Sequence, residues 1–286
     1  MIKMTVPFEN DTGNIVRKLA RKSLKSEKRR NLMVVIAVAL ASCLICFSIV
    51  MALSTRQIEK NHVEDTYEAV YTRITEEDVS TLKGLDDFSR VGEYYMLAVE
   101  PAEQGYNASY IYCDEETMYI ARDQMKLLEG RLPQKEDEVV VSRYFLSNYG
   151  ADAGIGEKVM LSSESFHGEY TVTGILEGYK EKEVNGTSIL LSKEALKGWS
   201  GYDPADYRAY VHFKNEQQMD ETELTARSRE IAKKYQLEMP VMNLSYMKFY
   251  KQPVNVSMLA LVAGIAVLVI IGGYVVIPVS YTHLRA

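Results

Sequence analysis

The sequence has few of the residues from which metal, redox and nucleophilic sites are usually built. It contains four histidines and three cysteines. The histidines are scattered, without an HExxH motif or the Cys/His spacing that is typical of zinc sites. Cys43 and Cys46 lie inside an apolar run, where we interpret their CxxC spacing as helix packing rather than metal binding. Cys113 has no partner outside that run, so no disulfide framework is predicted.

The motifs of nucleotide and acyl-transfer chemistry are also missing. GxxxxGK[ST] does not occur. The stretch GADAGIGEK resembles a phosphate loop, but Lys158 does not directly follow Gly156, and a predicted strand rather than a helix comes next. No GxSxG is present, and acidic pairs such as Glu76-Glu77 fit the start of a helix. We therefore predict that the chain is not an enzyme and holds no cofactor or metal of its own.

Charge is absent from two long stretches. Residues 32–53 read LMVVIAVALASCLICFSIVMAL, roughly 22 residues that would form a helix about 33 Å long and cross a hydrocarbon core of about 30 Å. A cleaved signal peptide is the alternative, but its apolar core would span about 7–15 residues. A second run, Val256 to Val279, predicts another membrane helix over residues 254–277. Its small residues Ala260, Gly264 and Gly272 either pack against another span or reflect ordinary membrane-helix composition.

Positive charge is concentrated before the first run. The net charge is −6, yet the first 31 residues hold about nine Lys and Arg against three acids. Residues 1–31 therefore predict a basic amphipathic helix on the membrane surface, with the topology-setting cluster Arg17, Lys18, Arg21, Lys22, Arg29 and Arg30. The positive-inside rule places this end in the cytoplasm and residues 54–253 outside. The remainder is acidic, which argues against a nucleic-acid partner, and the mean hydropathy of −0.16 indicates that most of the chain lies in water.

Residues 54–253 alternate between strand and helix patterns, which predicts an α+β domain. Helices are expected after the capping residues Thr75, Ser142, Ser192 and Asp220, and a short helix is expected to end at Gly130 in a left-handed conformation. The expected strands are residues 67–74, 91–99, 109–113, 138–141, 158–161, 169–176, 188–191 and 207–213.

Several of these segments together resemble a known family. They are Asn14 to Arg30 running into the first span, Gly130-Arg131-Leu132-Pro133 followed by Glu138 to Ser142, Ile155 to Val159, Tyr170 to Ile175, and Gly272 to Ile277. The chain is similar to the N-terminal half of an FtsX-like permease of an ABC transporter with a MacB-type extracytoplasmic core domain. The resemblance implies a multi-pass protein of the bacterial plasma membrane, assembled as a dimer of permease subunits in membrane lipid.

The same resemblance implies that a separate cytoplasmic ATPase binds ATP and drives the permease. Its movements would pass through the spans to the outer domain, for substrate export or mechanotransmission. Four spans are expected in the family, whereas residues 278–286, PVSYTHLRA, look non-native. We therefore expect a fragment of a longer permease.

Two other classes of protein share part of this layout. A membrane sensor, such as a receptor or histidine kinase, also has a basic N-terminus, a span, an outer domain and a second span. A hydrolase anchored outside the cell would need a reactive serine or a metal. The outer domain shows no ligand signature, so the sequence leaves the substrate open.

Overall fold

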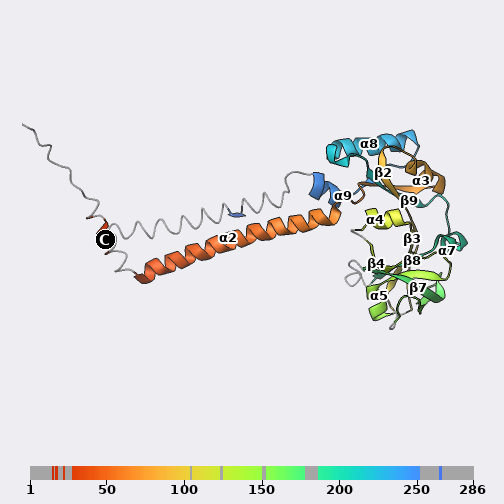
Figure 1. Cartoon of the computed structure of the whole chain (residues 1–286), viewed down its shortest axis with the longest axis horizontal. Coiled ribbons are helices and arrows are strands. Elements are labelled where there is room, and N and C mark those ends of the chain that lie inside the picture. The colour runs from red at the N-terminus through yellow and green to blue at the C-terminus, as the bar shows by residue number, and fades with distance from the viewer. Residues whose placement is uncertain are drawn as a thin grey trace, which may run out of the picture. The chain divides into compact units, whose positions relative to one another are not determined.

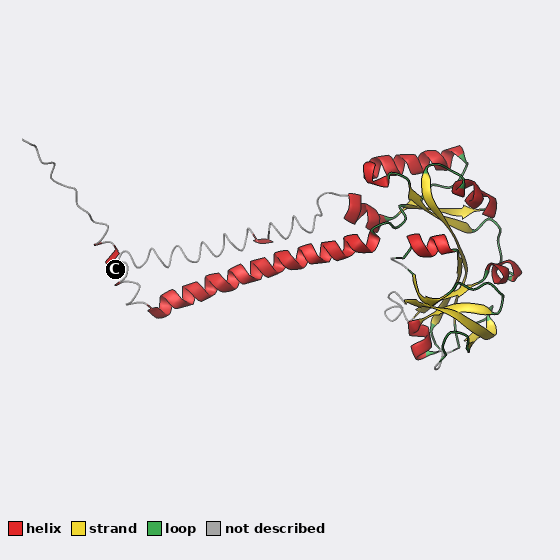
Figure 2. Ribbon diagram, viewed as in Figure 1, coloured by secondary structure: helices red, strands yellow, loops and turns green. Residues whose placement is uncertain are grey.

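The computed structural model describes residues 15, 17–18, 22, 28–103, 105–122, 125–149, 153–177, 186–251 and 264–265. The chain divides into two units, Met1–Arg56 with Val256–Ala286, and Gln57–Asn255. We call the second unit the core domain. Figure 1 shows the chain coloured along its length and Figure 2 shows it by secondary structure.

The described helices are one long helix, α2, and several shorter helices in the core domain. They are α2 (Lys28–Val63), α3 (Glu76–Lys83), α4 (Glu115–Ile120), α5 (Arg143–Asn148), α7 (Lys193–Gly198), α8 (Glu221–Lys234) and α9 (Leu244–Tyr246), with the 3₁₀ turn η1 (Glu216–Gln218) and the π-helical turn η2 (Met247–Lys251). The strands are β1 (Ala69–Ile74), β2 (Phe88–Pro101), β3 (Asn107–Cys113), β4 (Lys126–Gly130), β5 (Glu138–Ser142), β6 (Lys158–Ser162), β7 (His167–Glu177), β8 (Gly186–Leu191), β9 (Tyr207–Phe213) and β10 (Val241–Met242).

Within the described residues, ten strands form one sheet. The order is β10-β1-β9-β2-β3-β8-β5-β7-β4, and β6 pairs with β7. Only the pairs β3–β8 and β5–β7 are parallel among the described ladders. β2 pairs with β9 along its first part and with β3 along its second, so this one strand joins the two halves of the sheet.

Each face of the sheet carries its own apolar core, because neighbouring residues of a strand point to opposite faces. The larger core includes side chains of α3, α5, α7 and α8, such as Leu82, Phe145 and Leu224. The smaller core contains Tyr94, Cys113 and other strand residues together with Ile120 of α4. Figure 2 shows α4 on the inner side of the curved sheet. Among the described helices, α4 alone therefore supplies buried side chains to the smaller core.

The first predicted span lies within α2. Most of its described apolar side chains are exposed, including Leu44 at 66% and Phe47 at 64%. Burying one such side chain is worth about 1.5–3 kcal/mol, so this surface favours an apolar surrounding. Among the described residues, one stretch has the length and composition to cross a membrane, namely Ser42–Val63 in α2. The second predicted span, residues 254–277, lies outside the described residues except for 264–265.

The predicted caps are confirmed. Thr75 and Asp220 each form a capping box at the start of α3 and α8, and Ser142 and Ser192 cap α5 and α7. The short helix before Gly130 was a wrong prediction. Gly130 has the expected positive φ of 84°, but it ends strand β4, which pairs with β7. The predicted strand 169–176 is confirmed as β7, which begins two residues earlier, at His167.

Candidate functional site

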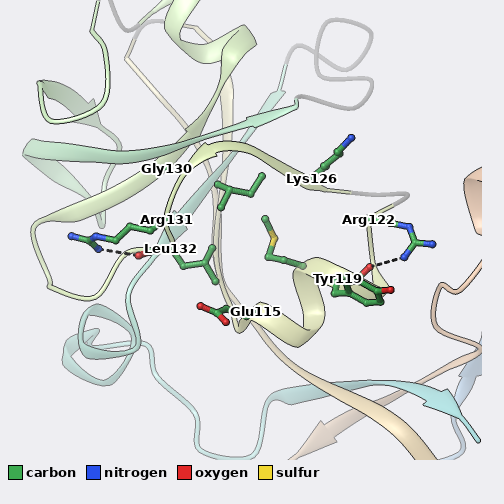
Figure 3. A pocket seen from close by; sticks show the side chains of 9 residues that line it. Glu115, Tyr119, Arg122, Lys126, Gly130, Arg131 and Leu132 are labelled. Atoms are coloured by element: carbon green, nitrogen blue, oxygen red, sulfur yellow. Dashed lines mark hydrogen bonds between the residues drawn. The ribbon is translucent and has the colours of Figure 1, made fainter.

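A hollow of about 420 Å³ lies between α4 and β4 on the side of the smaller core. Figure 3 shows side chains from both elements around it. Met118, Leu127 and Leu132 are partly buried and pack against the smaller core, so they form an apolar floor. The other lining residues are Glu115, Tyr119, Arg122, Lys126, Gly130 and Arg131.

Two glycines allow β4 to bend tightly against β7 at one side of the hollow. A Cβ on Gly130 would lie 2.2 Å from the carbonyl oxygen of Thr173, and one on Gly174 would lie 2.9 Å from that of Arg131. Gly130 also has a φ of 84°, which residues with a side chain rarely adopt. The glycines therefore set the path of the loop that lines the hollow.

An ion pair holds the segment after β4 in place. Two guanidinium nitrogens of Arg131 donate to the Glu138 carboxylate at 2.8 and 2.7 Å. The backbone N–H of Gln134 donates to the same carboxylate at 2.9 Å. Hydrogen bonding from Arg131 first, and from the backbone second, lowers the pKa of Glu138 to about 2. This two-pronged contact fixes the loop between β4 and β5.

On the opposite side of the hollow, an exposed tyrosine lies near two arginines. The guanidinium carbons of Arg90 and Arg122 lie 4.1 and 5.2 Å from the centre of the Tyr119 ring, which is the range of cation–π contacts. Arg90 also pairs with Glu116 at 2.7 Å. Arg122 donates to the backbone carbonyl of Glu64, so α4 is connected to the segment that follows α2.

A second polar site lies where α2 ends. Glu68 has a fully buried side chain, and one of its oxygens lies 2.7 Å from Nδ1 of His212. Its other oxygen accepts the N–H of Phe213 at 2.8 Å. Nδ1 of His212 also lies 3.0 Å from the carbonyl oxygen of Thr66, three residues after the last residue of α2. We call Glu68 and His212 the acid–histidine pair.

Comparison with known proteins places this architecture in a family. A family model described as the MacB-like periplasmic core domain matches residues 32–228. The chain belongs to this family. It therefore carries the MacB/FtsX-type core domain of ABC-transporter-type permeases, as the sequence predicted.

Two solved structures are similar to this MacB-type chain. The extracellular domain of YknZ, a noncanonic ABC-type transporter from Gram-positive bacteria, is 16% identical, with a TM-score of 0.44 and coverage of 62% of this chain and 100% of that one. The periplasmic region of MacB from Actinobacillus actinomycetemcomitans is 11% identical, with a TM-score of 0.45 and coverage of 65% and 91%. No curated protein matches.

The predicted basic cluster of this MacB-type chain is described only in part. Arg17, Lys18 and Lys22 have helical backbones and exposed side chains. Arg29 and Arg30 lie in α2, with side chains outside the described part, and Arg21 is outside it altogether. The cluster stays a prediction.

The predicted packing face of the second span is described at one position. Gly264 is helical and exposed, whereas Ala260 and Gly272 lie outside the described residues. Packing between spans therefore also stays a prediction.

The sequence interpretation missed both sites in the MacB-type core domain. Tyr119 and Leu127 have no local motif, although α4 and β4, the two sides of the hollow, follow one another in the sequence. Glu68 and His212 are 144 residues apart. One signal was available, since Glu68 stands between Tyr67 and Ala69 at the start of an apolar strand, where an acid needs a buried partner.

Proposed function

We propose that the chain is a permease subunit of a MacB/FtsX-type ABC transporter, driven by a separate cytoplasmic ATPase that binds the ATP. ATP-driven movement would reach the core domain and there expel a substrate or act on an outer partner. The proposal assigns no catalytic residue to this chain. It includes a dimer of permease subunits in membrane lipid with a cytoplasmic N-terminus.

One observation supports this proposal most directly. α2 is a single helix that contains the apolar run and continues to Val63, ten residues beyond Leu53. Only five residues separate it from β1, and several of these are hydrogen-bonded to the core domain. A continuous helix transmits displacement better than a loop because its backbone hydrogen bonds resist bending. The family match does not favour the membrane sensor.

The ATPase partnership is tested by co-purification. The full-length gene product, solubilised in mild detergent, is expected to retain an ATPase subunit encoded with it, and a permease variant that lacks the cytoplasmic loop between its second and third spans is expected to lose that subunit. A full-length protein that never binds an ATPase would defeat the proposal.

Coupling through α2 is tested by breaking the helix outside the apolar run. Gln57 is exposed and its side chain bonds to Asn61 one turn on. Gln57→Pro removes a helical hydrogen bond and costs about 3 kcal/mol locally, so it is expected to abolish ATP-dependent changes in protease sensitivity of the core domain. Gln57→Ala keeps the helix and serves as the control. Equal responses in both variants would count against coupling through α2.

A further inference from the structure

The acid–histidine pair links the segment through which the chain enters the core domain to the segment through which it leaves. Thr66, whose carbonyl faces His212, donates its hydroxyl to the carbonyl of Val63 at 2.7 Å. The backbone carbonyl of Glu68 accepts the N–H of Asn243 at 2.8 Å. Asn243 in turn caps α9 and donates its side-chain amide to the carbonyl of Tyr67 at 2.9 Å. The pair therefore lies between the end of α2 and the segment Asn243–Lys251.

That exit segment, which we call the cover, lies near the pair, since the charge of Glu68 acts on Tyr246 and Lys251. Tyr246 and Met247 are 1% and 3% exposed, and the Tyr246 ring stacks on that of Tyr250 at 5.2 Å. Lys251 donates to the backbone carbonyl of Glu216 in η1. The groups that act electrostatically on the pair or on its cover include Glu216, Lys251, Tyr246, Tyr250, Asp220, Glu64 and Asp65. Nζ of Lys60 in α2 also lies 4.9 Å from the centre of the Tyr250 ring.

The charge of the pair depends on a single proton. Nδ1 of His212 faces two acceptors, a carboxylate oxygen of Glu68 and the carbonyl of Thr66, so a hydrogen on Nδ1 satisfies both. The reference state is an ionised Glu68 beside a neutral His212, and when this pair takes up one proton its net charge becomes zero. Without it, the pair carries one net negative charge around a carboxylate that is fully buried. Burying an uncompensated charge is costly, whereas a neutral bonded pair is tolerated.

Two charged neighbours act on the pair in opposite directions. Lys251 contributes a positive charge and Glu216 a negative one, so their effects oppose each other. Burial raises the pKa of Glu68 against the lowering effect of His212. Burial lowers the pKa of His212, but the bond and charge of Glu68 and the charge of Glu216 raise it further, so the net direction is upward. Both members therefore bind protons more tightly in the folded protein than in the unfolded chain.

We propose that the acid–histidine pair is a proton-dependent latch, which takes up one proton as pH falls and holds the segment Asn243–Lys251 against the end of α2. When the proton leaves, the buried negative charge is relieved by local opening of this cover, which admits water. The two segments that the latch joins lead, along the sequence, to the two apolar runs. The inference does not depend on the ATPase partnership.

The sign follows from linkage. A group whose pKa is raised by folding contributes stability that is present below its unfolded pKa and is lost as pH rises through its folded value. The pKa values of Glu68 and His212 are both raised, so both contributions to stability are lost as pH rises. For His212 this loss occurs at a pH above the ordinary histidine pKa of 6.5. Lys251 has a lowered pKa because of burial, so its contribution has the opposite sign and belongs to a more alkaline range.

Hydrogen exchange of the full chain in lipid nanodiscs tests the latch between pH 6 and pH 8, after correction for intrinsic exchange rates. Amide protection of residues 243–251 is expected to fall at least about threefold as pH rises, because loss of the proton from the pair favours opening of this segment. Protection of α8, residues 221–234, is the internal reference and is expected to stay constant. An equal loss in α8, or protection that rises with pH, would overturn the latch.

Two variants remove the titration in different ways. Glu68→Gln keeps the shape but removes the acid, so protection of 243–251 is expected to become independent of pH. His212→Asn keeps an N–H donor but cannot take up a proton, so protection is expected to stay at the low, high-pH level. Glu138→Gln is the matched control, because it removes another buried carboxylate far along the sequence. This variant should retain the wild-type pH dependence of protection. A native response in both latch variants would overturn the proposal, and the wild-type series decides it even where a variant fails to fold.

Discussion

At the scale of single residues, close packing around α4 depends on a glycine. A Cβ on Gly92 of β2 would lie 2.4 Å from Oγ1 and 2.6 Å from the backbone of Thr117 in α4. The Thr117 hydroxyl donates to the carbonyl of Glu93 at 2.9 Å, so the helix cannot move away without losing this bond. The smaller core and the hollow therefore require a residue without a side chain at position 92.

Gly92→Ala is expected to destabilise the core domain by about 1–3 kcal/mol, the usual cost of overpacking. Urea unfolding followed by tryptophan fluorescence of Trp199 measures the change. Gly84→Ala is the control, since its new Cβ would lie 3.4 Å from the Thr81 carbonyl oxygen, which is an ordinary van der Waals contact. Similar stabilities for the two variants would contradict the close approach of β2 and α4.

Glu138 gives a prediction for acid conditions. Its pKa is lowered to about 2, first by the bond from Arg131, so its contribution to stability is present above the unfolded value of 4.5 and is lost as pH falls toward 2. The melting temperature of the wild type is therefore expected to drop between pH 5 and pH 3, and to drop less in Glu138→Gln. A thermal scan at each pH checks this, and parallel curves would argue against the ion pair.

At the scale of elements, a half-buried lysine joins helix α7 to α3 and to β2. Nζ of Lys193, the first residue of α7, lies 2.7 Å from Glu76 of α3 and 2.6 Å from Glu93 of β2. The Glu93 side chain is 8% exposed, and its other cation, Lys83, is more distant at 3.5 Å. Lys193 is thus the closer of the two cations that balance this buried acid among the described residues.

Lys193→Met is expected to lower the free energy of unfolding by about 2 kcal/mol, because a buried carboxylate loses its nearer cation. Lys197→Met is the matched control. Lys197 contacts the same Glu76 at 3.3 Å but is 52% exposed, so its loss should cost at most about 0.5 kcal/mol. Chemical denaturation of both variants measures the difference. Equal effects would mean that the buried Glu93 carboxylate does not depend on Lys193.

The elements that could be predicted from sequence are those fixed by local chemistry. A helix cap acts within three residues, so Thr75 and Asp220 could be identified without knowing the fold. The error at β4 arose because Leu127 and Leu128 fit a short helix or a strand equally well, and pairing with β7 decided between them. The acid–histidine pair could not be predicted, since only the sheet brings its two residues together. The hollow lies within one stretch of sequence, residues 115–132, but it could not be predicted while the segment before Gly130 was interpreted as a helix.

At the scale of the whole molecule, orientation in the membrane depends on the basic cluster. Reversing Arg17, Lys18, Arg21, Lys22, Arg29 and Arg30 to acids is expected to disturb topology, because positive charge holds a flank on the cytoplasmic side. Protease treatment of intact spheroplasts measures which side carries residues 54–253. Unchanged digestion of the outer region would count against this orientation.

The family, the α+β class and one apolar helix are established for the molecule, and each had a signal in the sequence. The second span and the dimer are properties that residues outside the described part or other subunits would determine. The protein family could be predicted without a catalytic motif. The resemblance rested instead on segments such as Gly130-Arg131-Leu132-Pro133 and the strand that follows it.

The position of the three cysteines has a practical consequence. Cys113 is buried in the smaller core, and burial raises the pKa of its thiol, whereas Cys43 and Cys46 are exposed on α2. A water-soluble maleimide that cannot enter lipid should therefore leave all three unmodified while the sheet is closed and the apolar run lies in the bilayer. The rate of Cys113 alkylation, measured by mass spectrometry, then reports how often the sheet opens, without any engineered label.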